Sequence, residues 1–182
     1  MANLKELKRF LLIAAFLWTG HFLYAQPDTW VRSAGGTSRD YVTDILVDAN
    51  GNAYLTGYYT DSIVFDGVKL VSEGDNDMYF AKYDADGNFQ WANSYGWHED
   101  DFGRAIALDD NGDLLVVGDY QDSTILGNDT IYSLDTLWYG PYATTFDVFL
   151  LTIDPNNGQL KNWYAGGWFA SERVNDLAID HL

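Results

Sequence analysis

Trp30-Val31-Arg32-Ser33-Ala34-Gly35-Gly36 is the stretch that decides the fold, because the chain repeats it. The pattern recurs 61 residues later as Trp91-Ala92-Asn93-Ser94-Tyr95-Gly96, and it starts a third time at Trp163-Tyr164-Ala165-Gly166-Gly167. A repeat of this length predicts several copies of one supersecondary unit, each packed against the next.

The repeat extends well beyond these three stretches. The first two units keep the spacing of 61 as far as Asp61-Ser62 and Asp122-Ser123. The spacing then grows to 70, where Asp77-Met78-Tyr79-Phe80 aligns with Asp147-Val148-Phe149-Leu150. The second unit therefore contains a nine-residue insertion near residues 126–145. We assign repeat 1 to residues 30–90, repeat 2 to residues 91–162, and a partial repeat 3 to residues 163–182.

The first 25 residues differ in composition from the rest of the chain. Lys5, Lys8 and Arg9 precede a mostly apolar run, and the small residue Ala25 then precedes Gln26. The run is shorter than the roughly 20 residues that a membrane-spanning helix needs. A membrane anchor or a buried N-terminal helix is the alternative, but we expect residues 1–25 to be a secretory signal peptide. Residues 26–182 would then be secreted, periplasmic or on the outer cell surface, with no membrane span after cleavage.

Charge and cysteine content restrict the possible partners. The chain has 27 acidic and 10 basic residues, a net charge of −17, and no cysteine. Such a charge repels nucleic acid and anionic lipid, so we expect no nucleic-acid partner. Without disulfide bonds, an exported domain must be stabilised by its core alone.

Strand patterns and turn patterns alternate through each unit. Alternation over residues 41–47 places Tyr41, Thr43, Ile45 and Val47 on one face of a strand. The predicted strands are 41–47, 53–58, 63–65, 78–83 and 89–92 in unit one, and 104–108, 114–118 and 148–153 in unit two. Asp-rich turns that contain glycine separate them. About four short antiparallel strands per unit are typical of a β-propeller blade, so we predict an all-β fold.

Unit one also resembles a known repeat. The residues that carry the resemblance are Trp30, Gly35, Gly36, Asp40, Gly51, Asn52, Tyr54, Gly57, Asp77, Lys82, Tyr83, Asp84, Gly87, Asn88 and Trp91. This pattern resembles the SBBP-type β-propeller repeat of secreted proteins from Bacteroidetes and related bacteria. Unit two departs from it at Trp97, Asp113, Leu115 and Thr152-Ile153. The resemblance implies a secreted or cell-surface propeller with no fixed catalytic activity.

Two and a half blades are too few to close a propeller, which typically has about four to eight. We therefore expect an incomplete propeller, the N-terminal fragment of a longer protein whose remaining blades are its partners. Assembly of several chains into a ring is the alternative. Produced alone, such a fragment would expose sheet edges and aggregate.

The Asp-rich turn at residues 84–88 is the candidate metal site. Asp84, Asp86 and Asn88 stand at alternate positions, as oxygen ligands do at the start of a calcium loop. However, Tyr95 occupies the position where such a loop needs its last acidic ligand. Asp or Asn followed by Gly is also typical of hairpin turns. We therefore favour a turn, keep calcium as the alternative, and expect no other cofactor.

The candidate ligand-binding residues lie in the insertion. Trp138, Tyr139 and Tyr142 are aromatic side chains on an extension of an otherwise regular blade, which suits a binding loop for a protein or glycan. Packing against a neighbouring blade is the alternative. Packing between blades is also the role we expect for Trp30, Trp91 and Trp163, because one of them recurs in every unit.

No pattern of catalytic residues is present in the sequence. It contains no phosphate-binding loop, no histidine cluster with metal-ligand spacing and no nucleophile elbow, and His98 has no counterpart in the other units. We therefore predict no catalytic residues and an exported, non-enzymatic propeller, a scaffold or recognition surface at the bacterial cell envelope. The alternative is a propeller enzyme or lectin that acts on polysaccharide.

Overall fold

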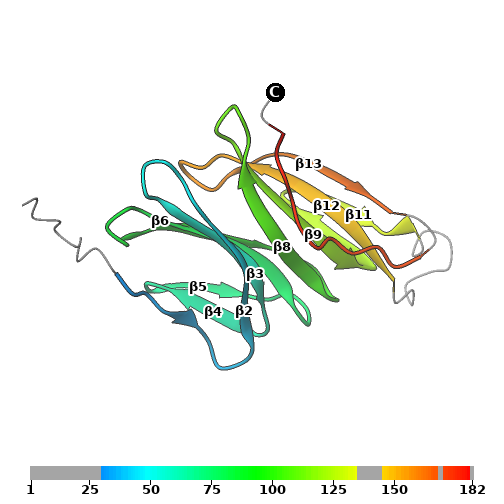
Figure 1. Cartoon of the computed structure of the whole chain (residues 1–182). Coiled ribbons are helices and arrows are strands. Elements are labelled where there is room, and N and C mark those ends of the chain that lie inside the picture. Colours follow the sequence, from blue (N-terminus) through cyan, green and yellow to red (C-terminus); the bar gives the residue numbers. More distant parts are fainter. Residues whose placement is uncertain (1–29, 135–144, 168–169, 181–182) are drawn as a thin grey trace, which may run out of the picture. The chain divides into compact units, whose positions relative to one another are not determined.

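The computed structural model describes residues 30–134, 145–167 and 170–180 (Figure 1). The chain divides into an N-terminal unit, Met1–Trp30, and a second unit, Val31–Leu182, which contains all the strands that the structure describes. The predicted signal peptide lies outside the described residues. Within the described part of the chain, no helix has both the length and the apolar character needed to cross a membrane.

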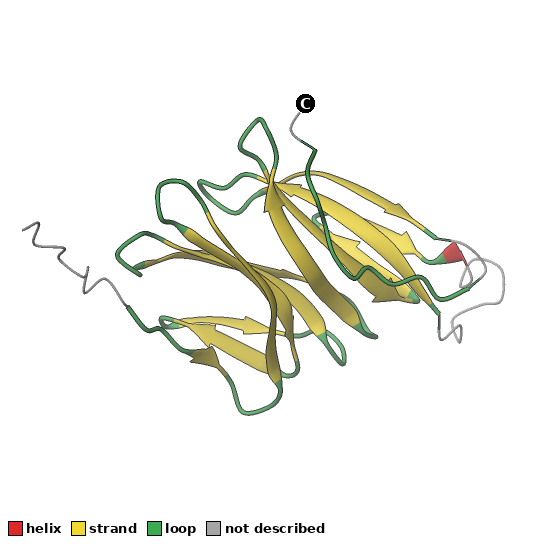
Figure 2. Ribbon diagram, in the orientation of Figure 1, coloured by secondary structure: helices red, strands yellow, loops and turns green. Residues whose placement is uncertain are grey.

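Two four-stranded antiparallel sheets make up most of the second unit (Figure 2). Blade 1 consists, in sheet order, of β2 (Asp40–Val47), β3 (Ala53–Tyr59), β6 (Asp77–Tyr83) and β7 (Phe89–Tyr95). Blade 2 consists of β8 (Asp101–Leu108), β9 (Leu114–Gln121), β12 (Phe146–Ile153) and β13 (Leu160–Gly166). Each sheet follows the chain from one edge to the other, which confirms the predicted all-β blades.

A short hairpin leaves each blade between its second and third strands. In blade 1 the hairpin consists of β4 (Ser62–Phe65) and β5 (Val68–Val71), and β1 (Ala34–Gly35) adds a third strand beside β4. In blade 2 it consists of β10 (Ser123–Leu126) and β11 (Asp129–Tyr132). The spacing of 61 therefore holds throughout this hairpin. The spacing of 61 also relates Glu73 to Leu134, because their amides make equivalent hydrogen bonds. The amide of Glu73 donates to Asp77 at the start of the next strand, and the amide of Leu134 donates to Asp147 in the same way. The insertion thus falls between Leu134 and Asp147, a narrower range than the predicted 126–145.

A β-bulge in β2 turns two consecutive side chains toward blade 2. The register shifts between Val42 and Asp44, so Thr43 is an extra residue in this strand. The Thr43 hydroxyl donates to the carbonyl oxygen of Gly103 at 2.8 Å. The amide of Ile106 donates to the Asp44 carboxylate at 2.9 Å. The bulge therefore fastens the first strand of blade 1 to the first strand of blade 2.

The same bulge contradicts one expectation from the sequence. Simple alternation would place Tyr41, Thr43, Ile45 and Val47 on one face, but an extra residue reverses the orientation of the side chains that follow it. Ile45 and Val47 are 56% and 61% exposed, whereas Thr43 contacts blade 2. The prediction of one shared face is therefore wrong.

The hydrophobic core joins the two blades. Its buried members are Tyr54, Met78, Phe80 and Trp91 from blade 1, and Ile106, Leu114, Val116, Tyr120, Leu126, Phe149, Leu151 and Ile153 from blade 2 and its hairpin. The Trp91 indole also donates to the carbonyl oxygen of Pro155, in the last turn of blade 2, at 3.3 Å. The predicted inter-blade role is thus confirmed for Trp91.

Trp163 does not occupy the position of Trp91. The last turn of blade 2 is one residue longer than that of blade 1, and the pairing registers therefore place Asn162 where blade 1 has Trp91. The Trp163 indole instead donates to the Asp129 carboxylate, on the hairpin of its own blade, at 3.0 Å. Trp163 nevertheless packs, partly buried, against the core that joins the blades, but from the opposite strand face, because one added residue reverses the side on which a strand side chain lies.

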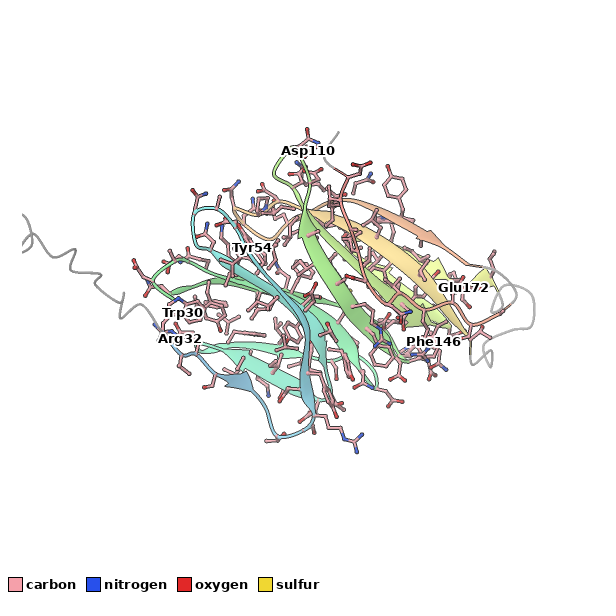
Figure 3. The ribbon with its side chains drawn as sticks, viewed as in Figure 1. Trp30, Arg32, Tyr54, Asp110, Phe146 and Glu172 are labelled. Atoms are coloured by element: carbon pink, nitrogen blue, oxygen red, sulfur yellow. The ribbon has the colours of Figure 1, made fainter. Side chains whose placement is uncertain are left out.

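The last described segment, residues 170–180, lies beside blade 2 (red in Figure 1). The amide of Glu172 donates to the carbonyl oxygen of Phe146 at 2.7 Å, and both residues are labelled in Figure 3. The amide of Asp101 makes the equivalent bond to Asn76, also at 2.7 Å, where β8 meets blade 1. The partial third repeat therefore joins blade 2 by the contact that joins blade 2 to blade 1.

Candidate functional site

The three candidate calcium ligands form a hairpin turn. The Asp84 carboxylate accepts hydrogen bonds from the amides of Asp86 and Asn88 at 3.0 and 2.8 Å, and from the side chains of Asn88 and Gln90, both at 3.0 Å. These hydrogen bonds, chiefly from the Asn88 side chain, lower the pKa of Asp84. Gly87 has a φ of 76°, the left-handed conformation that glycine adopts without strain.

The other Asp-rich turns share this arrangement. In each of them the first aspartate accepts from backbone amides two or four residues later; the residues are Asp48, Asp109 and Asp154. The described residues contain no group of three or more His, Cys, Asp or Glu side chains that could hold a metal ion. Residues 84–88 therefore form the predicted hairpin turn, and calcium binding there stays a prediction.

The candidate binding residues Trp138, Tyr139 and Tyr142 lie outside the described residues. His98 is described, and its ring packs on Trp97 with the ring centroids 4.2 Å apart. Neither group therefore defines a site in the described part of the chain.

A pocket of about 690 Å³ lies where the first strands of the two blades begin. Three aromatic rings form one wall. Tyr41 stacks on Tyr58 with centroids 4.8 Å apart, and Tyr58 meets the edge of Phe102 at 4.6 Å. Tyr41 is 45% exposed, although it lies on the side of β2 that faces blade 2. The aromatic wall therefore presents a solvent-accessible ring within the pocket.

A chain of hydrogen bonds forms the polar wall and crosses from one blade to the other. The Thr60 hydroxyl donates to the Asn76 side-chain oxygen at 2.8 Å, and the Asn76 amide donates to the Asp100 carboxylate at 2.6 Å. Asn76 and Asp100 also form an isolated bridge between their backbones. Linked groups of this kind hold one another in orientation, so the carboxylate and the amide are fixed before any ligand arrives.

Arginine side chains lie at the equivalent place on blade 2. Asp119 stands where blade 1 has Tyr58, and it accepts two hydrogen bonds from Arg104 at 2.7 and 2.9 Å. Arg173 lies 3.6 Å from the same carboxylate and 3.8 Å from the ring centroid of Phe146. The pocket between blades 1 and 2 is therefore not repeated on blade 2, because a carboxylate and two arginines stand there in place of Tyr58 and its neighbours.

The lining of the pocket suits binding better than nucleophilic catalysis. Besides the walls, it includes the carboxylate of Asp75 and the guanidinium of Arg39, but no histidine. An exposed aromatic ring beside fixed polar groups is the usual design of a small-ligand site. The sequence analysis missed this pocket, because Phe102 of blade 2 meets Tyr58 of blade 1 only through blade packing. The difference between Tyr58 and its counterpart Asp119 is the signal that could have revealed it.

Two comparisons with known proteins agree with this architecture. The family model for the SBBP β-propeller repeat matches residues 29–63. An uncharacterised WD repeat-containing protein of Acanthamoeba polyphaga mimivirus is 25% identical over 114 residues, which cover 53% of this chain and 8% of the relative. The chain thus spans less than a tenth of the length of that relative. The resemblance seen in the sequence is confirmed for the β-propeller repeat.

Proposed function

We propose that this chain, which carries an SBBP β-propeller repeat at residues 29–63, belongs to an exported, non-enzymatic propeller that recognises ligands at the bacterial cell envelope. The observation that carries the proposal is the pocket between the blades, where the aromatic wall lies beside the polar wall. The basic and apolar character of residues 1–25 supports export.

A saccharide is the ligand that fits this lining best. The C–H face of a sugar ring packs on an aromatic ring such as that of Tyr41, while its hydroxyl groups exchange hydrogen bonds with amide and carboxylate groups such as those of Asn76 and Asp100. Asp75 and Asp100 carry two negative charges against one positive charge on Arg39, so the pocket favours neutral sugars over acidic ones.

The experiment is a glycan array followed by calorimetric titration of the bound sugar. Tyr41→Ala removes the exposed ring, and we expect it to weaken binding by about tenfold. Tyr164→Ala is the matched control, because Tyr164 is another exposed strand tyrosine, 62% accessible, that does not line the pocket. The proposal fails if no glycan binds, or if both variants bind as the wild-type protein does.

The enzymatic alternative would use the same pocket, because both Asp75 and Asp100 line it and glycoside hydrolysis needs two carboxylates. Incubation with polysaccharides, followed by analysis of the reducing ends released, tests for this activity. Hydrolysis that is lost in Asp100→Asn would replace the non-enzymatic proposal.

We propose that a further blade is the partner of blade 1, packed on the exposed face of β2. Ile45 and Val47 are exposed there, whereas Ile106, the counterpart of Ile45 in blade 2, is 5% exposed and packs in the inter-blade core. The same strand face is therefore covered in blade 2 and uncovered in blade 1. A further blade that contacts blade 1 in the way that blade 1 contacts blade 2 would cover this face of β2.

A further inference from the structure

A second pocket, of about 390 Å³, lies where three segments meet. Its lining includes Tyr95 and Trp97 around the end of β7, Glu73 after β5, and Gly127 in the turn between β10 and β11. The carboxylate of Asp77, at the start of β6, also borders it. The pocket is thus separate from the candidate saccharide site, with which it shares no lining residue.

We propose that this pocket binds a primary alkylammonium group, held by the carboxylates of Asp77 and Glu73 and covered by the rings of Tyr95 and Trp97. Such a group occurs on a lysine side chain of a partner and on a free alkylamine. The proposal does not depend on the saccharide site.

Asp77 is the central acceptor of this site. It is 2% exposed, and one of its carboxylate oxygens accepts a hydrogen bond from the amide of Glu73 at 3.0 Å. The other oxygen, Oδ1, is buried, and no group among the described residues donates a hydrogen bond to it. A buried acceptor without a donor costs free energy, and an ammonium group supplies the missing donor. Burial raises the pKa of Asp77 to about 6, which leaves it mostly ionised at neutral pH.

Several of the groups around Asp77 differ from their counterparts in blade 2. Asp147 and Gly167 in blade 2 correspond to Asp77 and Gly96, and in both blades a Cβ atom on the glycine would overlap the carboxylate. This pair is therefore framework. By contrast, the counterparts of three further lining residues are smaller or apolar: Leu134 for Glu73, Ala165 for Ser94, and Gly166 for Tyr95. Among the described residues, the pocket beside blade 1 surrounds the framework carboxylate with a second carboxylate, a hydroxyl and the ring of Tyr95, and the blade 2 counterparts of these three groups lack them.

The chemistry of the lining favours an ammonium group over a metal ion. No Lys, Arg or His side chain lines the pocket, so its two carboxylates meet no positive charge there. The described residues contain no set of three His, Cys, Asp or Glu ligands, and two carboxylates are few for a calcium site. Aromatic rings, on the other hand, attract organic cations through their negative faces. A primary ammonium also has three N–H donors to share among Asp77, Glu73 and Ser94.

The experiment is an NMR titration of the 182-residue chain with n-butylammonium and with Nα-acetyl-lysine amide. Neutral 1-butanol and Ca²⁺ serve as control ligands. We expect saturable binding of both amines, with a shift of the Trp97 indole signal, and no such effect of 1-butanol. Binding of only the lysine derivative would support a peptide partner, and binding of only butylammonium would support a free amine.

Matched variants separate this site from a general effect of charge. Glu73→Gln should weaken amine binding by up to about fivefold, the effect of one exposed ion pair. Asp75→Asn removes the same charge two residues away, from the lining of the other pocket, and should leave the affinity unchanged. Asp77→Asn should weaken binding more than Glu73→Gln does. If Asp77→Asn does not fold, Tyr95→Ala takes its place.

Three results would overturn the proposal. The first is the absence of saturable binding by either amine, which would show that the pocket does not bind an ammonium group. The second is an equal loss of affinity in Glu73→Gln and Asp75→Asn, since it would show that only the overall charge matters. The third is displacement of the amines by Ca²⁺ at equal concentration, which would assign the site to a metal ion.

Discussion

The indole N–H of Trp91, in the last strand of blade 1, donates a hydrogen bond to the carbonyl oxygen of Pro155, in the last turn of blade 2. The ring is 8% exposed and belongs to the core that joins the blades. Lys82 donates to the same carbonyl oxygen at 2.9 Å. Blade 1 and blade 2 are therefore connected at this turn by specific polar contacts as well as by apolar packing.

Trp91→Ala should lower the free energy of unfolding by about 3–5 kcal/mol, because it removes a buried aromatic side chain and leaves a cavity. Trp91→Phe should cost less, since the ring volume is largely kept and the hydrogen bond is lost. Urea unfolding followed by circular dichroism measures both. A cost below about 1 kcal/mol for Trp91→Ala would show that the inter-blade contact contributes little.

Asp77 should make the fold less stable as the pH rises from about 4 to about 7. Burial raises its pKa from 3.8 to about 6, so the folded state holds the proton over a range in which the unfolded state has released it. The contribution of this group to stability is therefore complete below pH 3.8 and is lost as the pH rises through 6, by about 3 kcal/mol at most.

Four other aspartates have lowered pKa values and therefore change the stability with pH in the opposite direction: Asp48, Asp84, Asp109 and Asp154. Comparison of the wild-type protein with Asp77→Asn isolates the contribution of Asp77, because both proteins contain these four residues. Melting temperatures measured at pH 4, 5, 6 and 7 should fall more steeply for the wild-type protein than for the variant. Parallel curves would show that Asp77 has no such role.

The exposed flank of β2 should promote association of the isolated chain. Ile45→Lys combined with Val47→Lys should reduce self-association and change the unfolding free energy by less than about 1 kcal/mol, since both side chains are exposed. Sedimentation velocity and urea unfolding measure the two quantities. Ile106→Lys is the control, because the same substitution at the buried counterpart should unfold the protein. A monodisperse wild-type chain would contradict the prediction.

The ion pair between Arg104 and Asp119 should contribute strongly to stability, because Asp119 is 0% exposed. Arg104→Ala leaves a buried carboxylate with only the more distant Arg173, and we expect a loss of about 3 kcal/mol. Arg173→Ala should cost less than about 1 kcal/mol, since that side chain is 47% exposed and 3.6 Å away. Equal costs in thermal unfolding would contradict this ranking.

The sequence predicted the strands that alternate and are bounded by Asp-Gly or Asn-Gly turns, such as β3 and β6, to within a residue or two. It missed β10 and β11, because part of their sequence was assigned to the insertion, and β13, which carries polar and exposed residues. The bulge at Thr43 and the longer turn before Leu160 were missed for a related reason. One extra residue leaves the local composition almost unchanged, yet it reverses the face of every residue that follows.

The sequence by itself determined the repeat, the all-β blades and the turns, because these depend on local backbone preferences and on spacing along the chain. Only the tertiary structure decided which side chains share a pocket. Tyr41, Asn76 and Phe102 are distant in sequence and meet where two blades pack, and Glu73 meets Tyr95 only because a hairpin folds back on its blade. Contacts between units depend on register and on strand face, and both are settled only when the sheets pack together.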